Sequence, residues 1–91
     1  MDVYIEREKN ITLQEWLNYI KTDKDLVLEE LAEGFNPITK QKLKIRMEGR
    51  VLFDDCEIIY QKGHIGCDNY SERVLAKLKE IATSLGANVF E

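Results

Sequence analysis

The chain has 91 residues, of which 44% are hydrophobic and 33% are charged, and its formal net charge at pH 7 is -4. This length predicts a single domain over residues 1–91, and this composition excludes a disordered chain. No apolar run approaches the roughly 18 residues of a membrane span, and the polar start Met1 to Asn10 lacks the apolar core of a signal peptide. We therefore expect a folded cytoplasmic domain without a membrane partner.

Two elements are predicted in the first quarter of the chain. Apolar and polar residues alternate from Val3 to Arg7, which indicates a strand. Thr12 and Glu15 form a capping-box pattern ahead of a helix expected from Leu13 to Lys21. The apolar residues of this helix recur every three or four positions, which predicts one buried stripe that includes Trp16.

The middle of the chain allows two interpretations. Leu26 to Glu33 has good helix sequence, but it also fits a strand that pairs with the alternating segment Leu43 to Met47 across a turn at Phe35–Thr39. We favour the strand and expect the alternating segment to be half-buried. Val51 to Phe53 is predicted to join the same sheet.

A hairpin is predicted from Cys56 to Cys67. A two-residue turn at Lys62–Gly63 would pair Gln61 with His64 and place both cysteines on the apolar face. His64 would then point to the opposite face, as an exposed sheet residue. Because a zinc site needs converging ligands, we predict no metal at these residues and expect two free, buried thiols.

A second helix is expected from Ser71 to Leu85, ended by Gly86 and followed by a strand over Ala87–Phe90. The complete inventory predicts an α+β fold: a mainly antiparallel sheet of about five or six strands with two helices packed on one face. The other face must then be partly solvated. We expect that face, or an open sheet edge, to be a binding surface.

No sequence pattern indicates catalysis or a cofactor. The single histidine has no nucleophile in a recognisable signature around it, and no phosphate-binding glycine motif is present. The protein is therefore predicted not to be an enzyme. A small enzyme using its carboxylates is a third-ranked hypothesis, and its sharpest form rests on Asp54 and Asp55 acting as a pair.

Charged residues supply two candidate contact surfaces. The negative net charge favours a basic protein partner, contacted by acidic residues in two segments. These residues are Glu29, Glu30, Glu33, Asp54, Asp55 and Glu57. The alternative is a nucleic-acid patch on one side of a strand, although no aromatic residues interleave with its basic ones. The patch comprises Lys40, Lys42, Lys44, Arg46 and Arg50.

Three segments of the sequence, in this order, resemble small uncharacterised bacterial α+β proteins, some of them suspected immunity or accessory factors. The segments are Ile11–Trp16, Phe35–Thr39 and Leu78–Val89. The resemblance implies an immunity-type role and assigns no site residue.

The sequence thus predicts a small acidic, non-catalytic protein-binding domain, of an inhibitor or immunity type. A nucleic-acid accessory protein acting through Lys40 to Arg46 is the alternative. A core of this size is compatible with homodimerisation through an edge strand or the free sheet face, and the sequence leaves the oligomeric state open.

Overall fold

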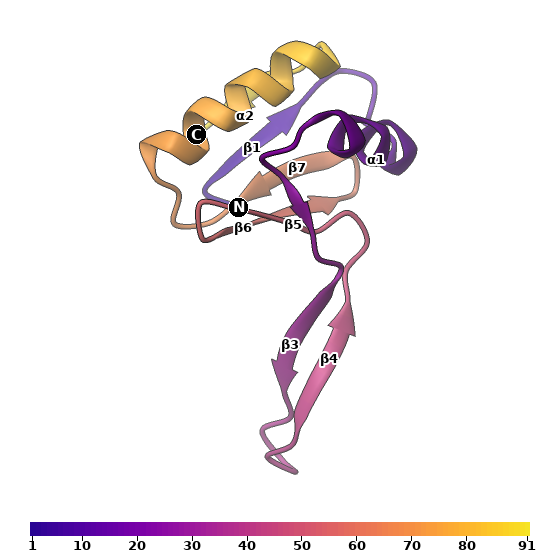
Figure 1. Ribbon diagram of the computed structural model, residues 1–91, viewed down its shortest axis with the longest axis vertical. Coiled ribbons are helices and arrows are strands. Elements are labelled where there is room, and N and C mark those ends of the chain that lie inside the picture. Colours follow the sequence, from indigo (N-terminus) through magenta and orange to yellow (C-terminus); the bar gives the residue numbers. More distant parts are fainter.

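The computed structural model describes residues 1–91, which form two helices and eight strands (Figure 1). In chain order the elements are β1 (Val3–Glu6), α1 (Leu13–Thr22), β2 (Val27–Leu28), β3 (Leu31–Phe35), β4 (Lys42–Arg46), β5 (Val51–Phe53), β6 (Cys56–Gln61), β7 (His64–Cys67), α2 (Glu72–Leu85) and β8 (Asn88–Phe90). Six strands form one antiparallel sheet in the order β2-β5-β6-β7-β1-β8. Strands β3 and β4 form a separate hairpin.

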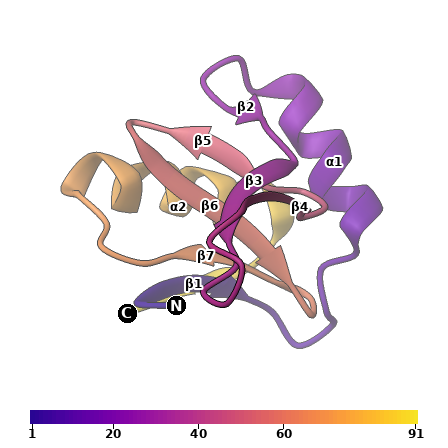
Figure 2. The ribbon, with the colours of Figure 1, turned by 90° about the horizontal axis from the view of Figure 1, so that it is seen from below.

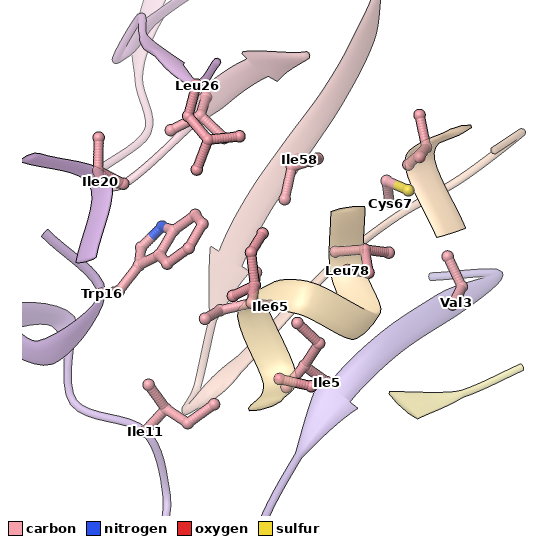
Figure 3. Close-up of a cluster of buried hydrophobic side chains, with 14 residues drawn as sticks. Val3, Ile5, Ile11, Trp16, Ile20, Leu26, Ile58, Ile65, Cys67 and Leu78 are labelled. Carbon is pink, nitrogen blue, oxygen red and sulfur yellow. The ribbon is translucent and has the colours of Figure 1, made fainter. Parts of the chain in front are cut away.

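Both helices pack against one face of the six-stranded sheet and enclose the core. The alternation along each strand sends one set of apolar side chains to this face, where Trp16 of α1 and Leu78 of α2 meet them (Figure 3). Fourteen buried side chains form this single cluster. The predicted α+β architecture, with helices on one sheet face, is therefore confirmed.

The local predictions with clear end signals are confirmed. The side chain of Thr12 accepts a hydrogen bond from the backbone N–H of Glu15, as expected for an N-cap, and Ser71 caps α2 in the same way. The Glu15 carboxylate accepts hydrogen bonds from the Arg7 guanidinium and from the Thr12 hydroxyl. Gly86 ends α2 in the left-handed conformation.

The predicted register of the β6–β7 hairpin is also confirmed. Gln61 pairs with His64 and Tyr60 with Ile65, across a turn in which Lys62 and Gly63 both have positive φ. The sheet alternation therefore places His64 on the face opposite the core, while Cys67 is buried in the core.

Residues 26–33 were correctly predicted to be extended, but they form parts of two strands rather than one. The helical interpretation was wrong, and the strand is broken at Glu29–Glu30 into β2 and β3. β2 pairs with β5 in the main sheet, whereas β3 leaves the sheet to pair with β4. Because β2 and β3 pair with different strands, the segment does not continue as a single strand.

The β3–β4 hairpin projects from the body, and residues 31–46 are here called the arm (Figure 1). It stands on the side of the sheet that the helices leave open, and in the view from below it lies in front of the strands (Figure 2). The molecule is consequently elongated, with extents of 44 × 27 × 25 Å. The expectation of a half-buried strand at β4 was wrong, because every residue of β4 is exposed.

The arm is fixed to the body at its root, defined here as Glu29–Glu30 and Met47–Arg50. The buried indole N–H of Trp16 donates a 2.7 Å hydrogen bond to the carbonyl oxygen of Gly49. Gly49 has a φ of +77°, and a Cβ added to it would lie 2.8 Å from Cδ1 of Trp16. Only glycine satisfies both the backbone conformation and the indole packing.

We expect Gly49→Ala to lower the free energy of unfolding by about 3 kcal/mol, because it adds a left-handed alanine and overpacks the core. Urea denaturation followed by tryptophan fluorescence measures the loss. The matched control is Gly86→Ala, which has a similar φ of +64° but no atom within 4 Å of the added Cβ. Its expected cost is about 1 kcal/mol. Equal losses for the two variants would contradict the packing argument.

Candidate functional site

The arm exposes large apolar side chains that nothing in the chain covers. Its pairing register places Leu43 and Ile45 on one face, opposite the small residues Gly34 and Ala32. The other face carries Leu31 and Phe35 together with charged residues. The four large side chains are between 43% and 61% exposed. An isolated two-stranded hairpin is marginally stable in water, so uncovered apolar side chains on both of its faces mark this arm as a contact surface.

The tip of the arm is ordered by its own hydrogen bonds. The Asn36 side chain accepts from the backbone N–H of Ile38 at 2.9 Å, and the Asn36 carbonyl accepts from the N–H of Lys40 at 2.7 Å. Pro37 restricts the backbone between them. Ile38 is 90% exposed at the end of this turn. Since the turn is formed in advance, a partner that contacts Ile38 has little ordering entropy to overcome.

Charge is divided unevenly between the arm and the rest of the chain, here called the body. The arm contains Lys40, Lys42, Lys44 and Arg46 and one acidic residue, Glu33, which gives a net charge of +3. Since the whole chain carries -4, the body carries -7. Lys42, Lys44 and Arg46 share one face of β4, as the sequence predicted, and Lys44 lies opposite Glu33 in the pairing register.

The sheet face opposite the helices forms a second uncovered surface, here called the open face. Its central rung runs from Ile59 through Gly66 and Tyr4 to Phe90, with the Met1 side chain beside Gly66. The rings of Tyr4 and Phe90 stack at 5.5 Å. Val27 and Leu52 extend the apolar surface across β2 and β5. The predicted partly solvated face is thus substantially apolar.

A polar rung borders the apolar one on the open face. His64 Nε2 lies 2.8 Å from a Glu6 carboxylate oxygen, and the His64 ring lies edge-on to Tyr4. A pocket of about 340 Å³ opens beside this pair, lined also by Gln61 and Lys62. The pocket contains no serine or cysteine beside this pair.

Two of the predicted acidic contact residues support the arm root. Glu57 accepts a hydrogen bond from Arg50 Nε, and Arg50 Nη1 donates to the backbone carbonyl of Glu29 at 2.8 Å. The Glu30 carboxylate accepts the N–H of Gly49 at 3.0 Å and lies 3.7 Å from Arg46. Arg50 is thereby removed from the predicted basic patch, since its charge is used inside the body.

The other acidic candidates lie in two different places. Asp54 and Asp55 form the β5–β6 turn, where both have positive φ. Asp54 accepts hydrogen bonds from Arg73 and Ser71, so it ties the turn to the start of α2. Glu33 is on the arm, far along the chain from this turn. The six predicted carboxylates therefore do not form one free acidic surface.

Neither cysteine is arranged for nucleophilic or metal chemistry. Both thiols are free, and Cys67 is buried whereas Cys56 is half-buried. Burial, followed by its hydrogen bond with Cys56, raises the pKa of the Cys67 thiol to about 12. Nowhere in the structure do three or more His, Cys, Asp or Glu side chains gather in a way that could hold a metal ion.

Lys77 is the one buried basic side chain, 6% exposed, and it joins the two helices. Its ammonium contacts the carboxylates of Asp23, Asp25 and Glu80 at about 3 Å. Burial lowers the lysine pKa, but the hydrogen bonds to these carboxylates raise it further, and the net shift is upward. A catalytic lysine needs the opposite shift, so we assign Lys77 a structural role.

The exposed arm was not foreseen from the sequence. Its signal was present in Phe35 and Ile38, two large apolar residues on either side of a proline turn, where most turns carry polar residues. Tyr4 lies on the open face, whereas Tyr19 stacks on Trp16 and donates to Asp23.

Comparison of the chain with protein-family models, curated proteins and solved structures found no match. Neither helix has the length and apolarity required to cross a membrane.

We expect Lys77→Met to destabilise the fold by about 3 kcal/mol, because it leaves the buried Asp23 carboxylate without its cation. Adding Asp23→Asn should recover at least about 1 kcal/mol, since the amide is neutral and can still accept from Tyr19. Urea denaturation of both variants measures this recovery. A double variant less stable than Lys77→Met would contradict the assigned role.

Proposed function

We propose that this protein is a non-catalytic protein-binding domain that contacts its partner through the arm and the open face. The observation that carries the proposal is the arm itself, a rigidly rooted hairpin with uncovered apolar side chains on both faces and at its tip. Such a surface is costly in water and is stabilised when another surface covers it.

The surface area of the molecule supports this proposal. A compact monomer of 10.6 kDa is expected to expose about 5,500 Å², but this chain exposes 6209 Å². The excess of about 700 Å² is close to the roughly 800 Å² that each partner buries in a standard protein interface. The arm is the feature that makes the molecule depart from a compact shape.

The negative charge of the body supports the inhibitor or immunity form of this proposal. The body carries a net charge of -7, which favours rapid association with a basic protein. Because Glu30, Glu57 and Asp54 are engaged inside the body, the contact would fall on its other carboxylates. The exposed Asp55 is one of these.

A nucleic-acid role is the second candidate, and one observation favours it. Lys42, Lys44 and Arg46 project from one face of an exposed two-stranded ribbon, an element narrow enough to enter a DNA major groove. Against it, the same ribbon also exposes large apolar side chains on both faces, and the body would repel phosphates.

A photoreactive amino acid at Ile38 tests the principal proposal. In cells that produce the protein, irradiation should yield a discrete protein adduct, because this side chain lies at the end of the arm. The control places the same amino acid at Lys79, an exposed position on α2, where we expect no adduct. Adducts of equal yield at both positions would reject the arm as the contact site.

Fluorescence anisotropy with labelled duplex DNA and single-stranded RNA tests the second candidate. We expect no salt-dependent binding by the wild type beyond that of the Lys42→Glu/Lys44→Glu/Arg46→Glu variant. A wild-type affinity that falls steeply with salt, and is lost in this variant, would establish the nucleic-acid role.

A further inference from the structure

We propose that the partner of the arm is a second copy of this chain, so that the arm of each copy contacts the open face of the other. The inference rests on the proposed protein-binding function and names its partner. It predicts a closed dimer with two identical contacts, because a two-fold axis relates two copies in which each arm contacts the open face of the other.

Charge complementarity is the first argument. The arm, at +3, and the body, at -7, belong to the same molecule, so each copy offers the charge that the other lacks. Contact between two arms would instead bring like charges together. The open face itself carries Glu6, whose side chain is 42% exposed. A lysine side chain of an incoming arm could pair with this carboxylate.

The apolar surfaces are also complementary in kind. The arm tip presents Ile38 and Phe35, and the open face presents the rung of Ile59, Tyr4 and Phe90. Each surface is a strip of large apolar side chains bordered by charges. Apolar contact at the centre with charged groups around it is the usual organisation of a protein interface.

The position of the arm makes the exchange geometrically direct. The arm and the open face lie on the same side of the molecule (Figures 1 and 2). Two copies placed with their open faces toward each other would therefore each direct an arm at the other's sheet. The eight residues from Leu31 to Ile38 span at most about 26 Å, which is about the width of the body, so a tip can reach the facing sheet.

The surface area fits this occupant. An excess of about 700 Å² per copy, buried by both copies, gives about 1,400 Å² in total. This total falls within the range of roughly 1,200–2,000 Å² that stable, specific interfaces bury.

Analytical ultracentrifugation of the purified protein at a series of concentrations tests the inference. We expect a mass of two 10.6 kDa chains, with dissociation favoured by added salt. Two variants test the two sides of the contact, the arm and the open face, separately. Ile38→Asp places a negative charge on the arm tip, and Ile59→Lys places a positive charge on the open face.

Each variant alone should weaken dimerisation at least about tenfold. The carboxylate introduced by Ile38→Asp would meet an apolar acidic face, and the ammonium introduced by Ile59→Lys would meet a basic arm. An equimolar mixture of the two variants should dimerise again. In the mixed dimer, one contact is native and the other joins the two introduced charges. Circular dichroism checks that both variants are folded, and Lys79→Asp on α2 is the control that should leave the mass unchanged.

Three results would overturn the inference. They are a wild type that is monomeric at every concentration, a dimer insensitive to both variants, and a mixture that does not recover. The photo-crosslinking experiment separates this failure from failure of the proposed function. If the protein is monomeric but position 38 still crosslinks to a different protein, the proposed function holds with another partner. If the protein is monomeric and gives no adduct, both the dimer and the proposed function are rejected.

Discussion

The hydrogen bond from the Trp16 indole to the Gly49 carbonyl is the contact on which the rest of the arrangement depends. Trp16 is fully buried between α1 and the sheet, so its polar N–H must find an acceptor inside the fold. The acceptor is the backbone at the point where β4 returns to the sheet. Core and arm are thereby positioned by one side chain, and the arm leaves the body in a fixed direction.

The arm root extends this constraint through charged groups. Arg50 binds Glu57 on β6 and the carbonyl of Glu29, while Glu30 binds the N–H of Gly49. Glu30 and Glu57, which the sequence suggested as contact residues, therefore support the arm root instead. The two cations nearest the root, Arg46 and Arg50, are paired with carboxylates of the body. The free cations of the arm are therefore its lysines, which lie farther from the acidic body.

The sequence was most informative where local chemistry decides the structure. The β6–β7 hairpin follows from a Lys–Gly turn and strict alternation, both confined to twelve residues, and its register was predicted correctly. The detachment of β3 and β4 could not be predicted in this way. Alternation shows that Leu43 and Ile45 share a face, but it is the same whether the body covers that face or leaves it open. The roles of Glu30 and Glu57 depend on residues distant in the chain, which no local pattern reveals.

The topology of the sheet has a consequence for the integrity of the chain at the arm tip. Cleavage after Lys40 would divide the protein into two fragments, one supplying β1 and β2 and the other supplying β5 to β8. β1 lies between β7 and β8, and β2 pairs with β5, so strands of the two fragments interleave in one sheet. The fragments would stay associated through the core without a covalent link. The tip is consequently the position where this fold tolerates a break or an inserted segment, while every contact in the body is preserved.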